Sequence, residues 1–228
     1  MTPSDENKLA LALEYPRLSG GTAPSLPEEQ AGPVKSQLDL IYAIDWLSTL
    51  VLFILTMPVL LVSLLYVMVV DRGNPIFSQI RIGMGGKPYR IFKIRSMHHD
   101  HHGHARFCAH EDDRILPGGQ FLRRTRIDEL PQFWNVLMGN MALVGPRPEQ
   151  SAFVESFLQE IPRYGERFHV KPGITGLAQV SQGYVDSVNG TRIKLSYDLM
   201  FIENRTLRMW AFIVLKTVKV VIFGQGAR

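Results

Sequence analysis

The sequence predicts an α+β fold in which an apolar, membrane-associated helix near the N-terminus precedes a small domain of short strands and helices. Residues 46–70 contain no charged side chain and are long enough to cross a hydrocarbon core of about 30 Å. Residues 75–79 and 89–95 alternate apolar and polar side chains, as half-buried strands do. From residue 130 to 141, apolar side chains recur at helical spacing. A chain of 228 residues suits one domain with its own core.

Residues 1–36 are expected to form a disordered tail, because they are polar, rich in Pro, Gly and Glu, and lack the apolar stretch of a secretory signal peptide. Residues 1–39 have a net charge of −3, whereas residues 71–228 contain 22 Lys and Arg against 14 Asp and Glu, a net charge of +8. This basic balance would suit nucleic acid, anionic lipid or a nucleotide diphosphate. The single cysteine, Cys108, excludes an internal disulfide framework.

Residues 37–71 are predicted to form the membrane helix. The excess of Lys and Arg between residues 72 and 95 places the following part of the chain in the cytoplasm. Pro58 removes a backbone donor near the middle of the helix, so we expect a kink there. A helix that spans the membrane and a helix that enters and turns back both fit these residues, and the physics of the segment alone slightly favours the spanning helix.

The elements after the membrane helix are short. We expect strands at 75–79 and 89–95 with a turn at 83–86, helices at 150–159 and 193–204, and a Pro/Gly loop at 171–176. Residues 207–223 predict a further helix with Arg208, Lys216 and Lys219 on one side and apolar residues over much of the rest. That pattern fits a helix in the membrane interface and a helix packed on the core about equally well.

Residues 123–149 contain the most informative motif, two adjacent carboxylates between arginines and a Pro-Arg-Pro turn. Asp128 and Glu129 stand where the apolar stripe predicts the start of a helix, and a helix N-terminus favours an ionised carboxylate and phosphate oxygens. A carboxylate nucleophile, a place for a divalent metal and fixed positive charge are the parts of a phosphoryl-transfer site. The alternative is an N-capping Asp, a first-turn Glu and solvated arginines. The arginines that could hold a diphosphate are Arg123, Arg124, Arg126 and Arg147.

Residues 98–110 contain six of the seven histidines together with Cys108. Imidazole and thiolate groups are good zinc or nickel ligands, which makes this segment a candidate metal site. The spacing matches no closed zinc module, however, and the acidic and basic residues around it are typical of a solvated loop. We favour the loop.

Several long motifs occur in the order and at the spacing of one known family, the bacterial sugar transferases. From about Leu40 to the C-terminus the chain resembles the monotopic phosphoglycosyl transferases of this family, which load a sugar phosphate onto a polyprenyl phosphate. The motifs lie at residues 79–83, 86–97, 123–135, 145–148 and 171–180. The resemblance implies that residues 37–71 form a re-entrant helix broken at Pro58, with both ends in the cytoplasm. Residues 72–228 would then be the catalytic domain, with interfacial amphipathic helices, on the cytoplasmic face of the bacterial inner membrane.

The resemblance also implies the chemistry. Asp128 would attack a UDP-sugar, expel UMP and carry the sugar phosphate until undecaprenyl phosphate displaces it. Mg²⁺ would be the cofactor, with Asp128 and Glu129 as its protein ligands. The C-terminal residues 223–228 resemble members of the exopolysaccharide type, which weakly favours a hexose such as galactose or glucose over a diacetamido sugar.

Other residues match family positions as well. Arg123, Arg124 and Arg147 match positions that hold phosphate, and Asp198 matches a position that looks functional, although a structural salt bridge would explain that aspartate equally well. Arg126 stands where the family commonly has a small polar residue, so it receives no role.

Two other classes of function were weighed. A non-catalytic membrane-tethered scaffold or regulator of polysaccharide export would use the basic surface for docking and would not need Asp128. A nucleic-acid binder would show a helix-turn-helix or a stacking-aromatic module, and the sequence contains neither. We therefore expect UDP-sugar, polyprenyl phosphate and membrane lipid as partners and no nucleic acid, and we leave the oligomeric state open, a homo-oligomer included.

Overall fold

The computed structural model describes residues 33–98, 114–182 and 188–222. Helix α2 (Pro33–Asp71) includes residues 33–36, which were predicted to belong to the disordered tail. The rest of the predicted tail, residues 99–110 of the histidine-rich segment, and the C-terminal residues 223–228 lie outside the described part.

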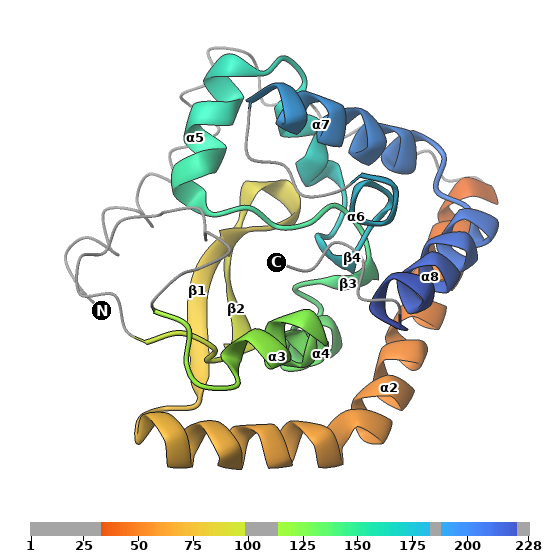
Figure 1. Cartoon of the computed structure of the whole chain (residues 1–228). Coiled ribbons are helices and arrows are strands. Elements are labelled where there is room, and N and C mark those ends of the chain that lie inside the picture. The colour runs from red at the N-terminus through yellow and green to blue at the C-terminus, as the bar shows by residue number, and fades with distance from the viewer. Residues whose placement is uncertain (1–32, 99–113, 183–187, 223–228) are drawn as a thin grey trace.

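Helix α2 is long, apolar and bent. It runs along two sides of the molecule and changes direction sharply between them (Figure 1). Pro58 lies inside the helix, which nevertheless continues through it, so the chain bends rather than breaks. Of the described helices only α2 is long and apolar enough to cross a membrane, by length and composition, between Asp39 and Asp71. The sequence thus predicted the helix correctly, and its path around the domain is new information.

The two faces of α2 differ. One face packs on the domain, where Leu60 and Val67 are buried against Ile94, Leu116 and Leu122. The other face is apolar and exposed, and it carries Leu47, Val51, Ile54, Leu55, Val59, Leu61, Val62, Leu65, Met68 and Val69. A bare apolar surface of this extent is typical of a protein that meets a membrane or a partner.

The N-terminal arm of α2 is tied to the domain by Asp45. Its buried carboxylate accepts hydrogen bonds from the backbone N–H groups of Leu143 (2.6 Å) and Val144 (3.2 Å) and from the indole of Trp210 (2.7 Å). These donors belong to strand β3 (Ala142–Val144) and helix α8 (Leu207–Ile222). The buried carboxylate is therefore compensated by three donors, as burial of a charge requires.

The C-terminal arm is tied to the same domain. The hydroxyl of Tyr66 donates to the carbonyl of Pro117 at 2.9 Å, and Asp71 forms an ion pair with Arg95 at 3.1 Å. Both arms of the apolar helix consequently lie against one globular unit.

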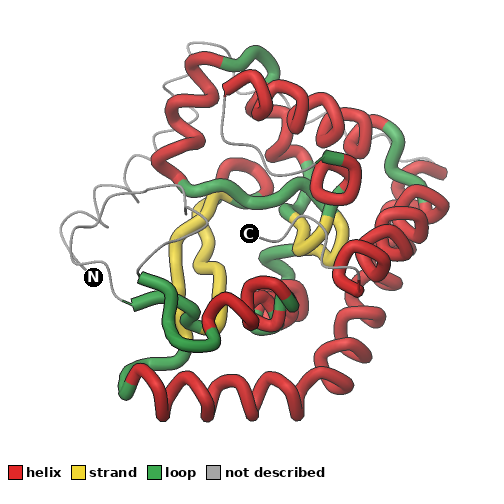
Figure 2. The backbone as a smooth tube through the Cα atoms, viewed as in Figure 1, coloured by secondary structure: helices red, strands yellow, loops and turns green. Residues whose placement is uncertain are grey.

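Two small sheets lie inside the ring of helices (Figure 2). Strands β1 (Ile76–Ile82) and β2 (Pro88–Ile94) form an antiparallel hairpin closed by the 3-10 turn η1 (Met84–Gly86), in which Gly85 adopts φ +68°. This hairpin confirms the prediction. Strand β3 pairs in parallel with β4 (Gly173–Thr175), a sheet that the sequence did not predict.

The remaining elements are helical. Helix α5 (Ser151–Glu160) confirms the predicted helix at 150–159, and α7 (Val188–Glu203) starts five residues before the predicted one. In α8, Ile213 is fully buried in the core while Phe212 and Leu215 are exposed beside basic residues, so α8 packs on the core and also presents an apolar, basic outer face. The other helices are α3 (Gly119–Arg124), η2 (Ile127–Glu129), α4 (Gln132–Leu137), η3 (Tyr164–His169) and α6 (Leu177–Ser181).

Candidate active site

Asp128 and Glu129 lie in the short 3-10 turn η2, between α3 and α4. The expected long helix starting at Asp128 is wrong: Pro131 separates η2 from α4, and α4 ends at Leu137. Arg126 adopts a left-handed conformation (φ +60°) that reverses the chain just before η2. Both carboxylates are buried, each with 7% of its surface exposed.

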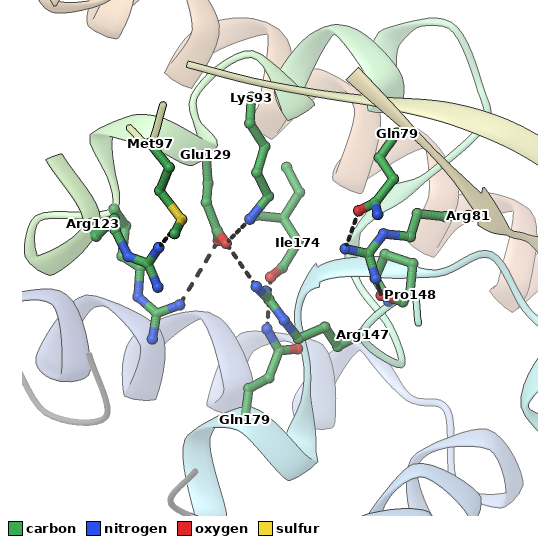
Figure 3. Close-up of polar contacts among 11 residues, drawn as sticks. Gln79, Arg81, Lys93, Met97, Arg123, Glu129, Arg147, Pro148, Ile174 and Gln179 are labelled. Atoms are coloured by element: carbon green, nitrogen blue, oxygen red, sulfur yellow. Dashed lines mark hydrogen bonds and ion pairs between the residues drawn. The ribbon is translucent and has the colours of Figure 1, made fainter. Parts of the chain in front are cut away.

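Glu129 is surrounded by cations (Figure 3). Its Oε1 accepts from Lys93 Nζ at 2.9 Å and from Arg147 Nη2 at 2.8 Å, and its Oε2 lies 3.9 Å from Arg126 Nη1. Burial acts to raise the pKa of Glu129, but the charges of Arg147 and Lys93 outweigh it and hold that pKa well below its usual range. The charge of Glu129 in turn raises the pKa of Arg147. Glu129 therefore stays ionised and holds strand β2 and the Pro-Arg-Pro turn together.

Asp128 has the opposite environment. Its Oδ1 atom is buried and accepts no hydrogen bond from any described residue. Burial raises the pKa of Asp128 to about 6, with the cations led by Lys93 opposing the rise and the neighbouring charge of Glu129 adding to it. An unpaired buried oxygen is costly, by about 1–3 kcal/mol, and groups of this kind with shifted pKa values are typical of functional sites.

Arginines from two elements border this carboxylate. Arg123, in the last turn of α3, donates to the sulfur of Met97 at 3.1 Å, a weak acceptor, and its charge lowers the pKa of Asp128. Arg147 reaches the site from the turn after β3. Arg124 is exposed next to Arg123, because neighbouring residues on a helix point about 100° apart. The structure thus brings Arg123 and Arg147 to the carboxylate pair.

The oxygen atoms of the site bear on metal binding. Mg²⁺ usually takes one or two protein carboxylates and completes its shell with water and substrate phosphates. The unpaired Oδ1 of Asp128 fits such a ligand, whereas Oε1 of Glu129 already accepts from two cations. Within the described ranges, no group of three or more His, Cys, Asp and Glu residues could hold a metal by itself. Asp128 Oδ1 would fit as one ligand of a Mg²⁺ ion whose other ligands are water or phosphate oxygens.

Comparison with known proteins identifies the family of this chain. Residues 37–224 match the family model of the bacterial sugar transferases. The chain belongs to this family. It is 42% identical to the UDP-N-acetylgalactosamine-undecaprenyl-phosphate N-acetylgalactosaminephosphotransferase of Aeromonas hydrophila. The 186 aligned residues cover 81% of this chain and 44% of that protein.

Two further relatives show the range of named substrates. A UDP-glucose:undecaprenyl-phosphate glucose-1-phosphate transferase of Caulobacter vibrioides is 39% identical over 187 residues, 81% of this chain and 70% of that protein. A UDP-galactose-lipid carrier transferase of Erwinia amylovora is 35% identical over 199 residues, 80% of this chain and 40% of that protein. The chain therefore spans less than half the length of two of these three sugar transferases.

Lys93 is a residue of this site that sequence reasoning missed. It lies on β2, where the buried side chain of Asn135 accepts from the N–H of Phe92 (3.1 Å) and donates to the carbonyl of Arg90 (2.7 Å). Asn135 thereby fixes β2 against α4 and places Lys93 on Glu129. The period-2 pattern of the strand, which puts Lys93 on the same face as buried Ile91, is the signal that could have identified it.

Asp198 lies behind the site rather than in it. On α7 it is 2% exposed, and its Oδ2 accepts from Arg167 Nε at 2.8 Å. Arg167 also donates from Nη2 to the backbone carbonyl of Arg147 at 2.8 Å. The structural salt bridge, one of the two readings that the sequence allowed, is therefore present. Arg126, which received no role, contributes one of the cations around Glu129.

Proposed function

We propose that this sugar transferase moves a sugar 1-phosphate from a UDP-sugar to undecaprenyl phosphate and releases UMP, as the first membrane step in the synthesis of an exopolysaccharide or another glycoconjugate. The observation that carries the proposal is the buried, unpaired Oδ1 of Asp128 beside fixed cations. The names of the relatives, which specify UDP-sugars and undecaprenyl phosphate, support the substrate classes.

The proposed reaction has two displacements at one phosphorus. A carboxylate oxygen of Asp128 attacks the β-phosphorus of the UDP-sugar, the bond from that phosphorus to the bridging oxygen breaks, and UMP leaves with the electron pair. A phosphate oxygen of undecaprenyl phosphate then attacks the same phosphorus and releases the Asp128 carboxylate. With a pKa of about 6, Asp128 is mostly ionised at neutral pH and can act as the nucleophile. Two large anionic substrates can thus use one site in turn.

The cations of the site have a defined task in this scheme. Lys93, Arg123 and Arg147 supply fixed positive charge for the phosphoryl oxygens, and Glu129 holds Lys93 and Arg147 in place before substrate arrives. Asp128 and the substrate diphosphate would hold Mg²⁺, which when bound neutralises the diphosphate and the leaving phosphate.

We also infer that α2 is re-entrant, with both ends in the cytoplasm. On a straight helix Asp45 and Asp71 would be about 39 Å apart, and the bend in α2 instead lets both arms follow the sides of one domain (Figure 1). In the bent helix, Asp45 near one end and Asp71 at the other are both bonded to the domain, and the exposed apolar face lies between them. Exposed Phe121 on α3, Trp134 on α4 and Met138 just after α4 add to the apolar surface of the domain. This arrangement supports a location on the cytoplasmic face of the bacterial inner membrane.

The decisive experiment separates covalent from direct transfer. Purified protein is given radiolabelled UMP and unlabelled UDP-glucose, UDP-galactose or UDP-N-acetylgalactosamine, with Mg²⁺ and without polyprenyl phosphate. A covalent intermediate predicts that label enters the matching UDP-sugar, with the hexoses favoured. Label exchange that occurs only after undecaprenyl phosphate is added would show direct transfer. If none of the three UDP-sugars releases UMP in the presence of undecaprenyl phosphate, the proposed activity is contradicted.

A cysteine-labelling experiment tests the topology. With Cys108 replaced by Ser, a Ser25→Cys variant should resist an impermeant thiol reagent in intact cells and react after lysis. Labelling in intact cells would show that α2 spans the membrane. A Pro58→Ala variant restores the backbone donor and should shift part of the population toward the spanning state. If it leaves the labelling unchanged, the bend depends on the contacts of Asp45 and Asp71 rather than on the proline.

A further inference from the structure

The turn of Pro146, Arg147 and Pro148, which presents Arg147 to the site, is held by hydrogen bonds from other elements. Pro146 and Pro148 have no N–H group, so the turn cannot form regular backbone hydrogen bonds of its own at these positions. Its three consecutive carbonyl groups accept from three different elements. The donors are Gly173 N of β4 to Pro146 (2.9 Å), Arg167 Nη2 of η3 to Arg147 (2.8 Å), and Arg81 Nη1 of β1 to Pro148 (3.3 Å).

Arg167 is the buried centre of this support. It is 5% exposed, and it donates from Nε to Asp198, from Nη1 to the hydroxyl of Tyr164 (2.7 Å) and from Nη2 to the carbonyl of Arg147. Three acceptors on three nitrogens match the planar fork of a guanidinium, which the single nitrogen of a lysine cannot reproduce. The charge of Asp198 compensates the buried cation and fixes the plane of the fork.

A second ion pair joins the same helix to the same turn. Glu149, the residue after Pro148, pairs with Lys194 of α7. Burial acts to raise the pKa of Glu149, but Lys194 and Arg167 outweigh it and lower that pKa to about 2. Helix α7 therefore holds the turn at two points, through Asp198 with Arg167 and through Lys194.

We propose that Arg167, oriented by Asp198, is a positioning residue for the transfer reaction. It holds the carbonyl of Arg147, so that the Arg147 guanidinium stays on Glu129 beside Asp128. Asp198 then acts through Arg167 and does not contact the substrate. The inference rests on the proposed function, because its effect is on transfer. A misplacement of about 1 Å in a positioned group can cost about 100-fold in rate.

The test compares the same substitution at Arg167 of η3 and at Arg163, the residue that precedes η3. Arg167→Lys keeps the charge but loses the fork, and we expect the rate of UMP/UDP-sugar exchange at saturating substrate to fall about 100-fold with a small change in KM. Arg163→Lys is the matched control, since Arg163 is 57% exposed and pairs with Glu166 and Glu203 at the surface. It should retain the wild-type rate. Asp198→Asn, which keeps the shape of the acceptor, should give an intermediate loss and serves if Arg167→Lys does not fold.

Two readouts separate positioning from general destabilisation. The first is the folded fraction from circular dichroism, which should equal that of the wild type in Arg167→Lys although its exchange rate falls. In a double-mutant cycle, adding Arg167→Lys to Arg147→Ala should cost no further activity. If the activity losses of Arg167→Lys and Arg147→Ala multiply in the double variant, the inference is overturned. A raised KM with unchanged kcat in Asp198→Asn would overturn it as well. A wild-type protein without any exchange would instead contradict the proposed function.

Discussion

The active site and the charged layer behind it use the same residue types but differ in how completely they are paired. In the layer behind the site, Arg167 satisfies all three of its nitrogens and Lys194 pairs with Glu149. No buried polar atom of these side chains or of Asp198 is without a partner in the described structure. In the site, Glu129 is paired as completely, while Asp128 next to it keeps a buried oxygen without a donor.

The difference indicates a division of work. A charged side chain whose polar atoms all have partners has a fixed protonation state and a fixed position. Such a side chain is suited to holding other groups in place. A buried carboxylate with a free oxygen and a pKa near neutrality can exchange partners, and it is therefore the candidate for chemistry. Glu129 belongs with the layer behind the site in this respect, although it is adjacent to Asp128 in the chain.

The largest expected effect comes from removing the unpaired carboxylate. Asp128→Asn keeps the shape and loses the nucleophile, so exchange and UMP release should fall by at least about 1000-fold. Because burial raises the pKa of Asp128 to about 6, keeping it ionised at pH 8 costs folding free energy, and the amide removes that cost. The Tm of the variant at pH 8 should therefore equal or exceed that of the wild type. UMP release at the wild-type rate would contradict the covalent mechanism.

Metal removal should have the next largest effect. EDTA should lower activity by at least about 100-fold, since a divalent cation supplies several kcal/mol to transition-state charge, and Mg²⁺ should restore it without added zinc. The Tm should not change in EDTA, because the described residues form no closed protein cage for a metal. Activity that survives EDTA, or that follows substitution of His98 to His104, would point to the histidine-rich segment as the metal site.

Replacing the paired carboxylate should impair activity by another route. Glu129→Gln removes the charge that holds Lys93 and Arg147, and we expect a loss of about 100-fold in kcat. If Glu129 only holds these cations, the Mg²⁺ concentration for half-maximal activity should be that of the wild type. A rise in that concentration would show that Glu129 is a metal ligand as well.

The pH profile should report Asp128 alone. Below pH 6 the free enzyme should lose kcat/KM about tenfold per pH unit, as the nucleophile becomes protonated. Glu129 should not contribute, because its pKa lies well below its usual range. Arg147→Ala should move this limb to higher pH, since Arg147 lowers the pKa of Asp128. A flat profile between pH 5 and pH 7 would contradict the assignment.

Local patterns in the sequence predicted the elements whose partners are close in the chain. The hairpin of β1 and β2 follows from alternation and a glycine turn, and the apolar character of α2 follows from composition. The apolar stripe from Leu130 to Met141 was misleading. Gly139 adopts φ +80° and the chain turns there, so Met141 is buried just before β3 rather than on a helix face.

Candidate residues were predicted from a motif, but the pairing of their side chains was not. Asp128, Glu129, Arg123 and Arg147 do meet at one place. Glu129 is fully paired and Asp128 is not, and this difference depends on Lys93, which reaches Glu129 from strand β2. Spacing along the chain contains no information about such a contact.

The sequence by itself determined a basic α+β domain with an apolar helix, because composition and periodicity act through neighbours in the chain, and its resemblance to a known family pointed to the phosphoryl-transfer motif. Tertiary structure alone decided that both arms of α2 return to one domain and that a parallel pair of three-residue strands carries the Arg147 turn. It also decided which carboxylate remains unpaired. The physical reason is common to all three. Burial and charge pairing depend on groups that are tens of residues apart in sequence, and their free energies exist only once the chain has folded.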